Sequence, residues 1–106
     1  MKKSIVIAAI FTALCALPAL AATTTLTGVV TDDMCGAHHM MPGKTDADCT
    51  RACVRRGAHF ALAVDDKVYI LSGNSAEVDR LAGAKATVQG ELNGNTIIVQ
   101  SIAAAK

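Results

Sequence analysis

The sequence predicts a small, mainly β domain: a barrel of five antiparallel strands, with one helix after the first strand and a shorter helix between the third and fourth. Three observations lead to this prediction. The chain has 106 residues, which suits one small domain. Segments rich in β-branched residues alternate along it and are separated by Gly, Asn and Asp turn signals. Two other segments carry the caps and stops of short helices.

A signal peptide is predicted before this domain. Two lysines lead into an apolar run over 5–17, which Pro18 breaks just before the residues ALA. That run is shorter than the about 20 residues that a membrane span needs. We therefore expect a leader over 1–21, cut after Ala21, and a single periplasmic or secreted domain over 22–106 with no stable membrane insertion.

The first strand and the first helix follow from local signals. Residues 24–33 read as a strand, with Leu26, Gly28 and Val30 on one face. After a loop that contains a Pro-Gly turn signal, TDADCTRACVRRG predicts a helix of about three turns. Thr45 or Asp46 would cap this helix, and Gly57 would end it.

The second half predicts two hairpins joined by a short helix. Residues 59–73 alternate around an Asp-Asp turn, and NSAEVDRLAG forms a helix with Ser75 as its cap and Gly83 as its stop. Residues 85–102 form a hairpin around an Asn93-Gly94 turn. The side chains expected to face inward on these strands are Phe60, Leu62, Val64, Val68, Ile70, Ala86, Val88, Leu92, Ile98 and Ile102.

Five strands with a helix between the third and fourth is the connectivity of an OB-fold-like barrel. The first connection, 33–57, then becomes an insertion that carries cysteine and histidine. The fold-level alternative is a small open sheet packed by two helices.

The chain also resembles a group of small secreted, largely uncharacterised bacterial proteins that look like OB-fold domains. The resemblance rests on DMCGAHHMM, on the C-x3-C of CTRAC, on a hairpin around DDKVYIL and on GAKATVQGELNGNTIIVQSI. Some relatives have a histidine three residues before the first helical cysteine, where this chain has Asp46. The resemblance supports export and fold, and it implies no activity.

The insertion concentrates the chemistry of the chain. Cys49 and Cys53 are four residues apart on the predicted helix, so their thiols share one face. Cys35 approaches from the preceding loop, followed closely by His38 and His39. Three sulfurs and one imidazole form a Cys3His set suited to zinc, or to copper as Cu(I), and the nearby thioethers of Met34, Met40 and Met41 favour copper. His59 reads as a surface or turn residue instead.

Two other interpretations of the cluster remain open. A disulfide from Cys35 to Cys49 or Cys53 would staple the domain in an oxidising compartment and leave one thiol over. That odd thiol would join two copies into a dimer or stay inert, so both a monomer and a thiol-linked dimer fit. Thiol redox chemistry needs a cysteine with a lowered pKa, and Cys49, in the first turn of its predicted helix, has a position that favours this. This interpretation ranks third because the C-x-x-C pattern is absent.

Composition disfavours other classes of function. Without the two leader lysines, 8 basic residues face 9 acidic ones, and the only aromatic residues outside the leader are Phe60 and Tyr69. Nucleic-acid surfaces use basic grooves and aromatic platforms, so nucleic acid is not an expected partner. No set of base, nucleophile and oxyanion donors is visible, so hydrolytic catalysis is not indicated. The expected partner is a metal ion or an unknown envelope protein.

Overall fold

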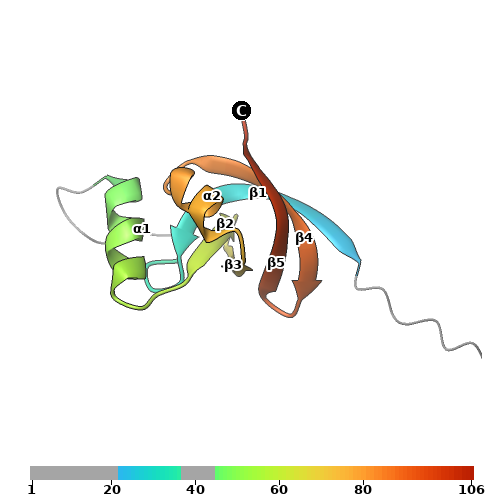
Figure 1. The fold of residues 1–106 in the computed structure, drawn as a ribbon, viewed down its shortest axis with the longest axis horizontal. Coiled ribbons are helices and arrows are strands. Elements are labelled where there is room, and N and C mark those ends of the chain that lie inside the picture. The colour runs from blue at the N-terminus through green and yellow to red at the C-terminus, as the bar shows by residue number, and fades with distance from the viewer. Residues whose placement is uncertain (1–21, 37–44) are drawn as a thin grey trace, which may run out of the picture.

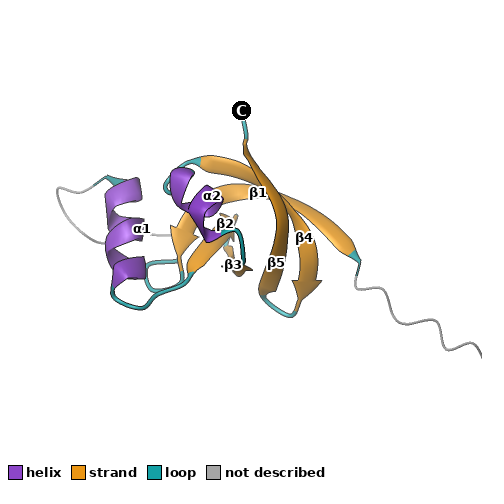
Figure 2. Ribbon diagram, in the orientation of Figure 1, coloured by secondary structure: helices purple, strands orange, loops and turns teal. Residues whose placement is uncertain are grey.

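The computed structural model describes residues 22–36 and 45–106. The predicted leader over 1–21 lies outside the described residues, as do His38, His39 and the Pro-Gly turn signal in 37–44. The described chain forms a mainly β fold with two short helices, in the predicted order (Figures 1 and 2). No helix in these described ranges is long and apolar enough to cross a membrane. The elements are β1 (Thr23–Asp32), α1 (Asp46–Arg55), β2 (Phe60–Val64), β3 (Lys67–Ser72), α2 (Ser75–Arg80), β4 (Lys85–Asn93) and β5 (Thr96–Ala104).

The five strands form one mixed sheet. Strand pairing runs β1-β2-β3-β5-β4 and returns to β1, which pairs with both β2 and β4. The prediction that all strands are antiparallel is wrong for one pair, because β3 and β5 run parallel. The reason is parity: strand direction cannot reverse at every step around a circuit of five strands. One parallel pair is therefore required wherever five strands pair in a closed order.

The core lies between the faces of these strands. Its central side chains are fully buried and almost entirely aliphatic, and α2 contributes one of them, Val78. The predicted inward positions on β1, β2 and β4 are confirmed. The buried cluster comprises Val30, Leu62, Leu71, Val78, Ala86, Val88, Ile97 and Val99.

The predicted inward face of β3 is wrong by one residue, and on β5 the prediction is confirmed for Ile102 and wrong for Ile98. In the β2–β3 hairpin Leu62 pairs with Tyr69, so Tyr69 and Leu71 face the core instead of Val68 and Ile70. On β5, Ile97 and Val99 are buried whereas Ile98 is 47% exposed. A register shift explains the second error. Gln89 pairs with Ser101 and Gly90 with Val99, which leaves one extra residue on β5 and reverses the alternation beyond it.

Helix α1 begins and ends where the sequence predicts. Thr45 is its N-cap and accepts a hydrogen bond from the Asp48 amide, and Gly57 beyond its end adopts φ +106°. The predicted cap of α2 is wrong: Asn74, not Ser75, is the N-cap, and its side chain donates to the Val99 carbonyl. Figure 1 shows α1 beside the end of β1, with α2 between α1 and the β4–β5 hairpin.

Candidate metal centre

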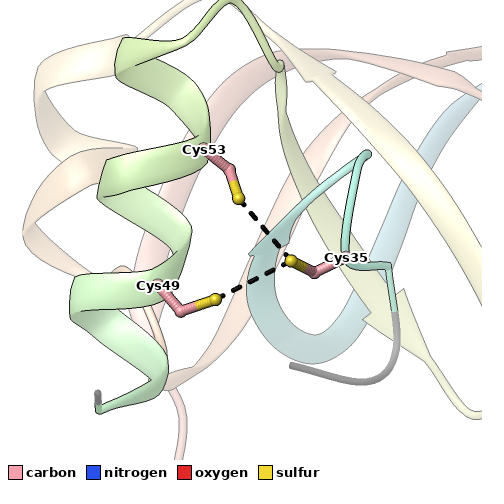
Figure 3. A group of neighbouring side chains, drawn as sticks. All are labelled: Cys35, Cys49 and Cys53. Carbon is pink, nitrogen blue, oxygen red and sulfur yellow. Dashed lines mark hydrogen bonds between the residues drawn. The ribbon is translucent and has the colours of Figure 1, made fainter. Parts of the chain in front are cut away.

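Helix α1 presents two cysteines toward the end of β1. Cys49 and Cys53 lie one helical turn apart and are 1% and 2% exposed. Both side chains point from the helix toward Cys35 (Figure 3). The helix is held in this orientation by contacts with β1 and by Arg51, which donates to the Asp79 carbonyl and carboxylate on α2. The i, i+4 spacing that the sequence contains thus becomes a pair of buried thiols on one face.

The third cysteine is positioned by a tight turn after β1. The Oδ1 atom of Asp32 accepts hydrogen bonds from the amides of Met34, at 3.0 Å, and Cys35, at 2.8 Å. The Gly36 amide donates to the Asp32 carbonyl, and Gly36 takes φ +61°, which suits glycine. The hydroxyl of Thr31 donates to the Gly36 carbonyl. A single carboxylate at the strand end therefore folds the turn that carries Cys35 toward α1.

The three sulfurs converge on one point. The Sγ of Cys35 lies 3.7 Å from that of Cys49 and 3.6 Å from that of Cys53, and all three lie within 4.8 Å of one another. None of the three forms a disulfide. Ligands at about 2.3 Å from a tetrahedral zinc ion are separated by ~3.8 Å, so these sulfurs are spaced as the ligands of one ion would be.

The surroundings of Cys35 and Cys53 favour the protonated form of these two thiols when no ion is bound. Burial above all, then hydrogen bonds with Cys53 and Cys49 and the negative charge of Asp32, raises the pKa of Cys35 to about 12. Burial also raises the pKa of Cys53; its hydrogen bond with Cys35 opposes this, and the charge of Asp32 adds to it. A metal ion must therefore displace protons to bind, which makes its affinity dependent on pH.

Among the residues that the structure describes, two buried side-chain oxygens on the elements that carry the cysteines have no hydrogen-bond partner. They are Oδ2 of Asp32, on the strand that leads to Cys35, and Oγ1 of Thr50, which follows Cys49 on α1. Both residues are 0% exposed. Buried polar atoms in native proteins are nearly always paired, so these two oxygens, on the two elements that supply the cysteines, are an unusual feature of the site.

The structure brings together three of the five predicted ligands, namely the cysteines. The other two, His38 and His39, lie outside the described residues. His59 is not part of this group: its ring Nδ1 lies 3.0 Å from Asp33 Oδ2 and its side chain is 68% exposed, as a surface residue would be. The residue that sequence reasoning missed is Asp32. The sequence feature that could have identified it is an aspartate at the end of a predicted strand, where its carboxylate can accept a hydrogen bond from the backbone amide two residues later.

Comparison with protein-family models, with curated proteins and with solved structures found no significant match. The function is therefore inferred from the chemistry of the cysteine cluster and its surroundings.

Proposed function

We propose that this protein is an exported small domain that binds one soft or borderline metal ion, copper or zinc, in envelope metal handling. The observation that carries the proposal is the group of three free cysteine sulfurs within 4.8 Å of one another, supplied by two separate elements. Thiolates are the preferred ligands of Zn(II) and Cu(I) in proteins. Residues 1–21 serve as the leader in this proposal, and the site acts in the periplasm or outside the cell.

The fourth position of the site is assigned to an imidazole. His38 and His39 follow Cys35 by three and four residues, so one of them completes a Cys3His set for zinc. Cu(I) needs no fourth ligand, since three thiolates already form a soft-ligand site for it. Both ions are therefore served by the same three sulfurs.

We also propose that the mixed sheet is an OB-fold-like barrel. The support is its pairing order, β1-β2-β3-β5-β4, together with the place of α2 between β3 and β4. In this reading the metal-binding insertion is carried by the first connection of the barrel and leaves the strands themselves free of ligands.

A disulfide-stapled structural or binding module is the second candidate. Cys35 lies at nearly the same distance from both helical sulfurs, so oxidation could join it to either one. Thiol redox catalysis gains less support. It needs a thiol with a lowered pKa, and the pKa values of Cys35 and Cys53 are raised.

Intact native mass spectrometry separates these candidates. The untagged protein is isolated from the envelope of producing cells without chelator or reductant. A mass raised by one metal ion, with three thiols open to alkylation after chelation, supports the metal site. A metal-free mass that lacks two hydrogens, with one thiol left to alkylate, refutes it and favours the disulfide.

Serine variants assign the ligands. In the full chain, Cys35→Ser, Cys49→Ser and Cys53→Ser should each lower zinc and Cu(I) affinity by about 100-fold or more, since each removes one of three thiolate bonds. Arg55→Ser is the matched control, because Arg55 is an exposed side chain on the same helix. An equal loss in Arg55→Ser and Cys49→Ser would contradict the assignment.

A further inference from the structure

Asp32 is a buried carboxylate that forms no salt bridge with any residue in 22–36 or 45–106. It is 0% exposed, and its Oδ1 accepts hydrogen bonds from the backbone amides of Met34 and Cys35. A side-chain hydrogen bond between Asp32 and Cys53 also contributes to the raised pKa of that thiol. Oδ2 has no hydrogen-bond partner among the residues that the structure describes. In the described ranges, the salt bridges join Arg51 to Asp79 and His59 to Asp33, and neither involves Asp32. A buried charge in a protein is normally paired with an opposite charge or a metal ion.

The carboxylate lies close to the cysteine cluster. Its Oδ1 is 2.8 Å from the amide nitrogen of Cys35, and the sulfur of that residue is three bonds from this nitrogen. The carboxylate therefore lies within about 7 Å of the Cys35 sulfur. Its field reaches the thiols: after burial, which is the largest cause, the charge of Asp32 contributes to the raised pKa values of Cys35 and Cys53.

We propose that Asp32 sets the charge preference of the site, favouring a divalent ion such as Zn(II) over monovalent Cu(I). This inference rests on the proposed metal-binding function and deepens it. Asp32 acts through its charge and not as a ligand, because the donor atoms that lie within 4.8 Å of one another in the described chain are the three sulfurs alone. Its second role, holding the turn of Cys35 through Oδ1, is separate from this preference.

The ratio of two affinities isolates the charge effect. Zn(II) and Cu(I) displace the same thiol protons when they occupy the same three sulfurs, so proton release cancels in the ratio of their affinities. Distortion of the turn by a mutation would weaken both ions through the shared sulfur positions, and zinc also through the imidazole that follows Cys35. Asp32→Glu perturbs the turn but keeps the charge, so it measures this contribution. The interaction with a fixed negative charge scales with ion charge and is twice as large for Zn(II). A change of the ratio in the neutral variant that is absent in Asp32→Glu therefore reports the charge.

The test compares Asp32→Asn with the wild-type full chain. Zinc affinity is measured by competition with a chromophoric chelator, and Cu(I) affinity by anaerobic competition with a Cu(I) chelator. Asparagine keeps the side-chain oxygen that accepts from the two amides and removes the charge. At an effective dielectric of about 20, removal of one unit charge within roughly 10 Å of the ion changes the zinc-to-Cu(I) affinity ratio by about tenfold or more. The ratio for Asp32→Asn should therefore be lower than that of the wild type by this factor.

Asp48→Asn is the matched control. It removes a unit charge beside Cys49, but from an exposed side chain on α1, where solvent screens the charge. Its affinity ratio should stay within about threefold of the wild-type value. Asp32→Glu keeps the charge and should also keep the ratio. If Asp32→Asn does not fold, as judged by circular dichroism, Asp32→Ser serves as the second neutral variant, since a hydroxyl also accepts from turn amides.

The outcomes are distinct. A ratio for Asp32→Asn within threefold of wild type overturns the inference, and so does a loss of equal size for both ions. The proposed metal function survives in either case. If the wild-type chain binds neither ion, both the proposed function and the inference fail. A fall of about tenfold in the ratio, absent in Asp48→Asn, assigns the preference to Asp32.

Discussion

Gly83 lies between β1 and the first turn of α1. Replacing it by alanine tests whether its close contact with α1 sets the position of the helical cysteines. Gly83 follows α2, takes φ +77° and donates its amide to the Val30 carbonyl on β1. A Cβ atom built at this position would lie 2.5 Å from the backbone nitrogen of Ala47. Ala47 is in the first turn of α1, two residues before Cys49.

Two costs add in Gly83→Ala. The left-handed backbone costs an alanine about 1–2 kcal/mol relative to a glycine. To reach an ordinary contact of 3.4 Å, α1 must also move away by about 0.9 Å, which is comparable to overpacking and costs about 1–3 kcal/mol. Gly94→Ala is the matched control, because Gly94 has φ +62° with nothing within 4 Å of its added Cβ. The difference between the two variants, about 1–3 kcal/mol, isolates the contact with α1.

Urea unfolding of the metal-free, reduced chain measures this difference, and zinc competition measures its effect on the site. A shift of α1 by most of an ångström exceeds the tolerance of about 0.2 Å in metal–ligand distances, so zinc affinity should fall by about tenfold or more in Gly83→Ala only. If the two variants agree in stability within about 0.5 kcal/mol, Gly83 does not position α1 and the reasoning is wrong.

Three further predictions concern pH, capping and export. Burial raises the pKa of Cys35 to about 12, from a usual 9.0, so the unfolded chain loses the Cys35 proton at a lower pH than the folded chain does. The urea midpoint of the metal-free chain should therefore fall as the pH rises from 9 to 12, and it should fall by less in Cys35→Ser. Thr45→Ala removes the cap of α1 and should lower the free energy of unfolding by about 1 kcal/mol in urea, with Thr45→Ser retaining most of it. Mass spectrometry of the exported protein should find an N-terminus at Ala22, and an intact leader would contradict the predicted cleavage.

The acidic side of the stability profile gives a fourth test, at the pair of Asp33 and His59. Partial burial alone would raise the pKa of Asp33, but hydrogen bonds from His59 outweigh it and lower that pKa. A lowered carboxyl pKa stabilises the fold above the unfolded value, and this stability is lost as the pH falls through the folded value. Asp33→Asn should therefore lose less stability on acidification than the wild-type chain. An unchanged acid profile by urea unfolding would refute this.

Elements set by neighbouring residues were predictable from the sequence. The bounds of α1 follow from a threonine cap, an acidic first turn and a terminal glycine, all within thirteen residues. The Asp65-Asp66 turn likewise appears where two alternating segments meet, with Asp65 at φ 52°. The spacing of Cys49 and Cys53 predicted their common face for the same reason: a helix fixes the relation of residues four apart.

Features that depend on distant pairing were not predictable in this way. The inward face of β3 is set by its register with β2, and that of β5 by an extra residue opposite Gln89 and Gly90. Asp32 was missed because aspartate is rarely buried, and only the turn around Cys35 shows why it is here. The parallel β3–β5 pair, by contrast, follows from strand count once a closed order is assumed.

The insertion that carries the cysteines leaves β1 and returns to β2 at one pair of facing residues, Asp33 and His59. The Asp33 amide donates to the His59 carbonyl, and the His59 amide donates to the Asp33 carboxylate, directly beyond the Asp32–Phe60 pair of the β1–β2 ladder. Because these bonds close the segment at its base, we expect the register of β1 with β2 to be insensitive to its length. We also expect that the segment can be grafted onto another antiparallel hairpin. A recipient must also supply a partner for Arg51, which donates to Asp79 on α2, and leave room for Ala47, which lies against Gly83 in the segment after α2.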